Sequence, residues 1–78
     1  MNGIRNLSQF SAGQTGKITQ ITGTGPFFTR LRSLGVRPDT FVKVVQRAPF
    51  GGPLCIDVSG SRFALPREEA QHILLSIS

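Results

Sequence analysis

The chain contains no tryptophan and no tyrosine, so six phenylalanines supply all of its aromatic bulk. Its single cysteine, Cys55, excludes an intramolecular disulfide and favours a reducing compartment. Apolar runs such as Ile73-Leu74-Leu75 are far shorter than the ~20 residues that a membrane-spanning helix needs. The segment from Met1 to Asn6 has no apolar run of signal-peptide length. We therefore expect a soluble, cytoplasmic protein.

Acidic residues are scarce as well, with four Asp and Glu against nine Lys and Arg, which gives a formal net charge of +5. A charge of this sign suits nucleic acid, anionic lipid or an acidic protein face. The basic residues are spread along the chain without a run of three, which favours a solvated surface over a dedicated polyanion site. At 78 residues, the chain is expected to form a single domain, residues 1–78.

Residues that could carry catalysis are few. Glu68 and Glu69 are adjacent and diverge on a helical turn, while Asp39 and Asp57 lie far apart in the sequence, so no convergent acid–base pair is evident. No nucleophile-elbow motif surrounds any serine, and Cys55 has no activating sequence beside it. The sequence therefore predicts a protein that is not an enzyme.

Metal and nucleotide motifs are also missing. One cysteine and one histidine, Cys55 and His72, do not supply the repeated ligand spacing of a metal site. The segment 23–26 (GTGP) resembles half of a dinucleotide-binding loop, but the third glycine is replaced by Phe28. We therefore expect no cofactor and no dedicated metal site.

Most of the chain shows the alternation and the turn residues of short β-strands. Five strands are predicted, over residues 16–22, 41–48, 54–58, 61–65 and 73–77. Ile18 and Ile21 do not share one face at a period of two, which predicts a bulge between them. Short helical turns are predicted at 7–10 and 66–70. Five such strands favour a strongly bent sheet that closes into a small barrel, because closure protects the strand edges.

One helix, Pro26 to Leu34, is predicted between the first two of these strands, since proline fits the first helical turn. Phe27, Leu31 and Leu34 recur at i, i+4 and i+7 and form the predicted core-facing stripe, with Phe28 at its edge. The overall prediction is a mainly β barrel with one inserted helix.

Five segments, in this order, resemble the FeoA family (ferrous iron transport protein A). They are Leu7-Ser8, residues 13–18 (GQTGKI), 30–38 (RLRSLGVRP), 48–54 (APFGGPL) and 63–70 (FALPREEA). The most specific feature is the RLxxLG helix end followed by the APxGGP loop. The resemblance runs from Leu7 to Ile77 and implies an SH3-like barrel.

The resemblance also implies a function. Members of this family are expected to be cytoplasmic accessories of FeoB, the membrane transporter with a G-protein domain that imports ferrous iron. Asp39 occupies a position where the family usually has glycine, and Asp tolerates a type I turn. An alternative from the residues themselves is a basic barrel that binds nucleic acid, with Phe41 and Phe50 as stacking platforms beside Lys43 and Arg47.

Five residues are candidates for partner binding: Phe50, Gly51, Pro53, Arg30 and Arg32. Phe50 is the strongest candidate, because a large aromatic at the tip of a Gly/Pro loop has little core to enter. The glycines and prolines around it are equally explained by the turn itself. Arg30 and Arg32 flank the predicted helix stripe, where they could meet an acidic partner face.

Overall fold

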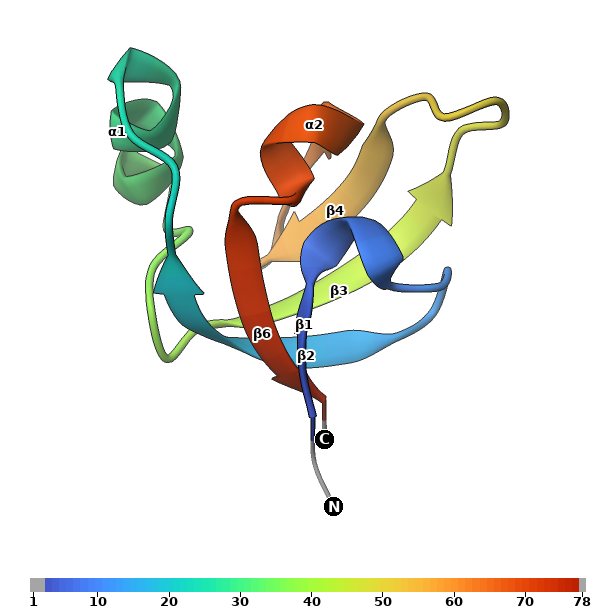
Figure 1. The fold of residues 1–78 in the computed structure, drawn as a ribbon, viewed down its shortest axis with the longest axis horizontal. Helices are drawn as coiled ribbons and strands as arrows, with labels where there is room; N and C mark the ends of the chain where they lie inside the picture. Colours follow the sequence, from blue (N-terminus) through green and yellow to red (C-terminus); the bar gives the residue numbers. More distant parts are fainter. Residues whose placement is uncertain (1–2, 78) are drawn as a thin grey trace.

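Six antiparallel β-strands form one continuous, bent sheet in the computed structural model, which describes residues 3–77 (Figure 1). The strands are β1 (Ile4–Asn6), β2 (Thr15–Ile21), β3 (Phe41–Arg47), β4 (Leu54–Val58), β5 (Ser61–Leu65) and β6 (Ile73–Ile77). They lie in the order β1-β6-β2-β3-β4-β5, so β1 and β5 are the edge strands. The predicted mainly β architecture is confirmed.

The sixth strand is the difference from the predicted five. β1 pairs with β6 through Ile4 opposite Ser76, Arg5 opposite Leu75 and Asn6 opposite Leu74. Its first two side chains are exposed, so it lacks the apolar alternation that identifies a strand in a sequence. Backbone pairing with β6, which no sequence pattern reports, holds it in the sheet.

Two irregularities bend the sheet around the core. The pairing of β2 with β6 shifts register between Ile18 and Gln20, which confirms the predicted bulge. A second shift, between Val44 and Gln46, interrupts the pairing of β3 with β4. Because a bulge adds a residue on one strand only, it increases the local twist and lets a short sheet curl.

The core is a single apolar cluster enclosed by the curled sheet. Its fifteen residues are Leu7, Phe10, Ile18, Phe28, Leu31, Val36, Val42, Val44, Leu54, Ile56, Val58, Leu65, Ala70, Ile73 and Leu75. The first two are Leu7, in the 3-10 turn η1 (Leu7–Gln9), and Phe10, which follows it; a helical turn was predicted at 7–10. Along β4, Leu54, Ile56 and Val58 are buried and the residues between them are half-buried, which is the alternation typical of a short strand.

Two short helices complete the fold. The helix α1 (Pro26–Ser33) connects β2 to β3 and stands at one side of the sheet, and α2 (Arg67–Ala70) connects β5 to β6 (Figure 1). Within residues 3–77, no helix has the length and apolar character needed to cross a membrane.

The face of α1 that meets the core differs from the predicted stripe. Phe28 and Leu31 are buried, whereas Phe27 is 38% exposed and Leu34 is 47% exposed. The cause lies at Gly23, where an added Cβ would be 2.2 Å from the Phe28 ring. The absence of a side chain there admits the Phe28 ring to the core and turns Phe27 outward. The stripe prediction was therefore right for Leu31 and wrong for Phe27 and Leu34.

The structure also settles the type of the turn after α1, which the sequence left open. Asp39 has a φ of 71°, and the Thr40 amide donates a hydrogen bond to the Arg37 carbonyl over 3.2 Å. A type I turn, which the sequence left open here, needs a negative φ at this third position, so the turn is not of type I. Proline at the second position and a positive φ at the third are the features of a type II turn. Asp39 thus takes the left-handed conformation that glycine would take at no steric cost.

Candidate partner-binding site

The loop between β3 and β4 ends in a tight turn that projects from the barrel. The Ala48 amide donates to the Pro53 carbonyl over 3.0 Å, and the Gly52 amide donates to the Pro49 carbonyl over 3.2 Å. The two central residues, Phe50 and Gly51, have φ values of 59° and 75°. Positive φ at both central positions identifies a type I′ turn, which normally prefers Asn or Gly at these places.

The structure leaves the Phe50 side chain fully exposed, with a relative accessibility of 104%. An L-residue pays about 1–2 kcal/mol for the left-handed conformation, and a bulky residue rarely adopts it. Among residues 3–77, the other non-glycine residues with positive φ are Asp39 and Ser59, both small and polar. Phe50 therefore combines backbone strain with a side chain that the core does not use.

The neighbouring loop residues have structural reasons for their identity. Gly51 needs its positive φ, and a Cβ at Gly52 would lie 2.8 Å from the Ala48 Cβ. Glycine at both positions is therefore explained by the turn. Pro53 is exposed beside the turn.

Sequence reasoning missed one charged residue at this loop, Arg67 on α2. Its Nη1 atom lies 3.3 Å from the place that a Cβ of Gly51 would occupy. Arg67 is exposed and separated from the loop along the chain, so only the fold brings its guanidinium beside the turn. The exposed aromatic ring at the tip thus has a positive charge near its base.

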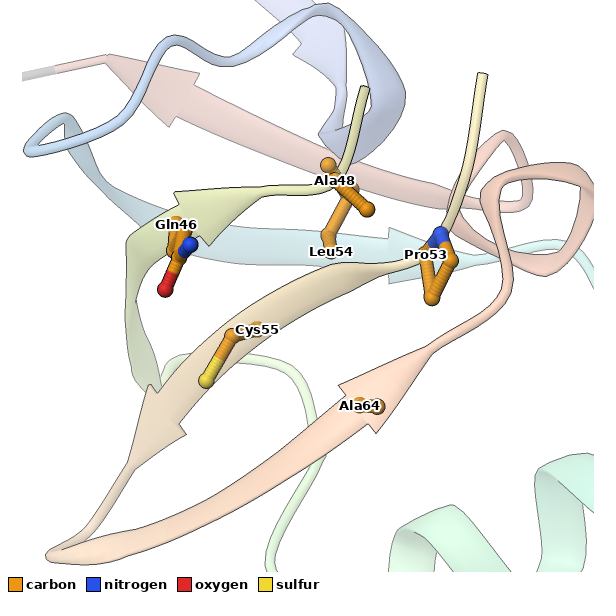
Figure 2. A pocket seen from close by; sticks show the side chains of 6 residues that line it. All are labelled: Gln46, Ala48, Pro53, Leu54, Cys55 and Ala64. Atoms are coloured by element: carbon orange, nitrogen blue, oxygen red, sulfur yellow. The ribbon is translucent and has the colours of Figure 1, made fainter. Parts of the chain in front are cut away.

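A shallow hollow of about 160 Å³ lies below the loop, on the surface formed by β3, β4 and β5 (Figure 2). It is lined by Gln46, Ala48, Pro53, Leu54, Cys55 and Ala64. We call it the loop hollow. Its wall contains the half-buried side chain of Cys55, a free thiol.

The two candidate arginines of α1 point to different surroundings, because residues two apart on a helix do not share a face. Arg30 lines a second hollow, of about 210 Å³, between α1 and β5. We call it the α1–β5 groove, and it is lined by Phe27, Arg30, Leu31, Leu34, Phe63 and Ala64. Arg32 is exposed outside it, and its carbonyl accepts a hydrogen bond from Arg37 Nε over 3.1 Å.

The five predicted site residues therefore fall into two regions. Phe50, Gly51 and Pro53 lie at or beside the loop tip, while Arg30 and Arg32 lie on α1. The loop hollow and the α1–β5 groove both include Ala64 of β5, so the two regions adjoin along this edge strand. Sequence reasoning missed this continuity, because it assigned Phe27 and Leu34 to the core.

One basic residue of the nucleic-acid alternative, Arg47, is bound within the fold. The Arg47 guanidinium donates from Nη1 to the carbonyls of Ser8 and Phe10, over 2.8 and 2.5 Å, and so fastens η1 to the sheet. Phe41 remains 56% exposed, with Lys17 Nζ 5.9 Å from its ring centroid. Phe41 is the first residue of the seven-residue strand β3 and Phe50 follows its last residue, so the two rings lie at opposite ends of an element about 20 Å long.

Groups that could hold a metal do not gather in the part of the chain that the structure describes. No three His, Cys, Asp or Glu side chains between residues 3 and 77 lie close enough together to surround an ion. Two of the acidic residues instead form surface ion pairs, Asp57 with Arg62 over 3.5 Å and Asp39 with Lys17 over 3.9 Å. Ion pairs of this kind contribute little to stability.

Comparison with known proteins gives a consistent result. A family model described as the FeoA domain matches residues 5–77. No curated protein matches the chain significantly. Among solved structures, the FeoA protein of Chlorobium tepidum is similar over 92% of this chain and 69% of its own, with 29% identity and a TM-score of 0.86.

Two further FeoA structures are similar over most of both chains. An iron uptake regulatory protein (FeoA) is 26% identical over 96% of this chain and 99% of its own, with a TM-score of 0.82. FeoA of Stenotrophomonas maltophilia, a zinc complex described as a prokaryotic SH3 domain protein, is 27% identical over 90% and 87%, with a TM-score of 0.79. The SH3-like architecture predicted from the sequence is confirmed by these likenesses.

Proposed function

Because this chain belongs to the FeoA family, we propose that it acts in the cytoplasm as an accessory protein of ferrous iron uptake, by binding a FeoB-type membrane transporter. Family membership makes it an iron-transport accessory domain. Beyond family membership, we propose the identity of the partner and the surface of this chain that contacts it. In this proposal the chain acts by binding and carries out no chemical step itself.

The observation that supports the proposal most directly is the exposure and the backbone conformation of Phe50. Its ring is fully exposed on a backbone that costs about 1–2 kcal/mol to hold. Strain that folding does not need is most often retained where it serves function. An aromatic ring on a rigid turn is also a favourable anchor, because it buries a large area in a partner pocket and loses little conformational freedom.

Charge supports an acidic partner surface. Arg67 lies beside the turn, Arg30 and Arg32 lie on α1, and the whole chain carries a formal net charge of +5. Complementary charge increases the rate of association and orients the encounter, while a buried aromatic anchor supplies most of the affinity. We infer that the transporter offers an apolar pocket bordered by carboxylates to the loop tip.

The test is ferrous iron uptake in cells that depend on this protein. Phe50→Ala should nearly abolish uptake of radiolabelled ferrous iron and co-purification of the transporter, because loss of a central aromatic anchor costs 2 kcal/mol or more, on the order of thirtyfold in affinity. Ser59→Asn is the matched control, since Ser59 occupies the first position of the other two-residue turn and is exposed. That variant should transport normally.

The nucleic-acid alternative is tested with the same variants. Wild-type protein titrated with a labelled single-stranded oligonucleotide at low salt should show no binding that depends on Phe50. Micromolar binding that falls steeply with salt and is lost in Phe50→Ala, together with normal iron uptake, would contradict the transporter proposal.

A further inference from the structure

The α1–β5 groove is apolar on most of its wall, and its floor includes Leu31 of the core. Phe27 and Leu34 are 38% and 47% exposed there, and Phe63 is half-buried beside them. These are large apolar side chains that the fold leaves in contact with water. An apolar hollow of about 210 Å³ has room for a large side chain of another molecule.

The position of the groove on β5 follows from strand geometry. Phe63 and Ala64 are consecutive residues of a strand, so their side chains point to opposite faces of the sheet. Both nevertheless line the same groove. A hollow that runs along the edge of the strand touches both residues. In Figure 2, the ribbon of α1 (green) accordingly lies on the side of β5 that is away from β4.

This edge of β5 is open. Within residues 3–77, β5 pairs with β4 and with no other strand, from Leu54 opposite Leu65 to Val58 opposite Ser61. Alternate residues of β5 therefore direct their N–H and C=O groups away from β4. Such an edge is a template for another extended chain, because the added strand satisfies backbone groups that otherwise bond only to water.

The charge at the groove indicates the kind of chain that fits. Arg30 is exposed and lines the groove, and its guanidinium has no carboxylate or hydrogen-bond partner among the residues that the structure describes. No acidic side chain is among the groove residues. A segment with a carboxylate near an apolar side chain would complement both the apolar wall and the arginine.

We propose that the open edge of β5 binds an extended, acidic and apolar segment of a partner protein as an added β-strand. Its main chain pairs with β5, one apolar side chain enters the α1–β5 groove, and a carboxylate binds Arg30. This surface is distinct from the Phe50 turn and shares only Arg30 with the candidate residues of the transporter proposal. The segment and the loop tip could thus be engaged by one partner at two adjoining places.

The test uses purified protein and peptides only, so its result is independent of iron uptake. A phage-displayed library of random linear peptides is selected on the wild type, and the enriched peptides are synthesised. We expect sequences with alternating apolar residues and at least one carboxylate. Their binding should shift the amide resonances of Phe63, Ala64, Phe27 and Leu34 and slow hydrogen exchange along β5.

Two controls distinguish strand addition from simple side-chain docking. Arg30→Glu should weaken binding about tenfold or more, whereas Arg5→Glu, the same charge reversal on β1, should not change it. Peptides N-methylated at alternate residues should fall into two classes. Peptides methylated at the residues whose N–H groups pair with β5 should lose binding. Peptides methylated at the residues in between should keep it. Thermal melts by circular dichroism check that each variant is folded.

Several results would overturn the proposal. They are recovery of no peptide, enrichment of basic peptides, equal effects of the two charge reversals, equal loss from both N-methylated sets, or resonance shifts confined to the Phe50 turn. Self-association that saturates the β5 edge in sedimentation experiments would also overturn it, since the occupant would then be a second copy of this chain.

Discussion

Replacing Phe50 by asparagine should stabilise the protein, although it removes a large apolar side chain. Phe50 and Gly51 form the centre of a type I′ turn, with φ values of 59° and 75°. Asparagine is favoured at the first of these positions because its short polar side chain hydrogen-bonds locally in the left-handed region. The Phe50 ring is fully exposed, so its loss sacrifices no buried area.

The expected gain follows from the backbone cost. The left-handed conformation costs phenylalanine about 1–2 kcal/mol, and it costs asparagine only part of this. We therefore expect Phe50→Asn to raise the free energy of unfolding by about 0.5–1 kcal/mol. Phe50→Ala keeps the Cβ that causes the strain, so its stability should stay near that of the wild type. Phe50→Val should be less stable than the wild type, because a β-branched residue suits a positive φ least.

Urea unfolding followed by far-ultraviolet circular dichroism measures this series, since the chain has no tryptophan or tyrosine to serve as a fluorescent probe. A domain of this size has a urea m-value of about 1 kcal/mol per molar, so the Phe50→Asn midpoint should rise by about 0.5–1 M. The melting temperature should rise by about 2–8 °C. The m-value should not change, because the same surface is exposed on unfolding.

Ser59→Asn tests the turn argument without touching the aromatic ring. Ser59 and Gly60, with φ values of 52° and 84°, form the two-residue connection between β4 and β5, so a similar gain is expected there. A Phe50→Asn variant less stable than the wild type, or a Phe50→Ala variant that loses more than about 1 kcal/mol, would show that the ring packs against the protein. The reasoning for an exposed anchor would then fail.

Three further stability predictions are checked by the same urea experiment. Leu31→Ala should cost about 2–4 kcal/mol, because Leu31 is in the core, whereas Arg32→Ala on the exposed face of α1 should stay within about 0.5 kcal/mol; equal effects would contradict the assignment of the helix face. Arg47→Met keeps the apolar stem but removes two charged hydrogen bonds to backbone carbonyls, so it should cost about 1.5–3 kcal/mol; a neutral result would mean that these bonds do not hold η1. Gly23→Ala should cost about 1–3 kcal/mol, because the added methyl group meets a buried ring at 2.2 Å, while Gly3→Ala, with nothing within 4 Å, should be neutral.

The central part of the fold could be predicted from sequence where local signals agree. β4 was placed at its observed bounds, Leu54–Val58, because the alternation of its side chains is complete and turn residues bound it on both sides. The two-residue connection at Ser59-Gly60 and the strand after it, Ser61–Leu65, were predicted from the same kind of turn residues and alternation. In these segments, the turn chemistry and the apolar period specify the same register.

Features that depend on tertiary contacts could not be predicted in this way. The exposure of Phe27 follows from the space beside Gly23, and the pairing of β1 follows from the position of β6. Arg47 was expected to be a free basic residue, yet it binds the carbonyls of a turn nearly forty residues earlier in the chain. None of these relations has a local pattern in the sequence.

The candidate surfaces lie where local preference and the fold disagree. A type I′ turn prefers Asn or Gly, yet it holds Phe50. Exposed positions of a short helix and its cap prefer polar residues, yet two of them are Phe27 and Leu34. Asp39 and Ser59 also have a positive φ, but they are polar residues of turns and expose no apolar surface. Disagreement alone therefore does not mark a site. It does so where the residue is also large, apolar and exposed, because a folded chain gains little from the exposed part of such a side chain until a partner covers it.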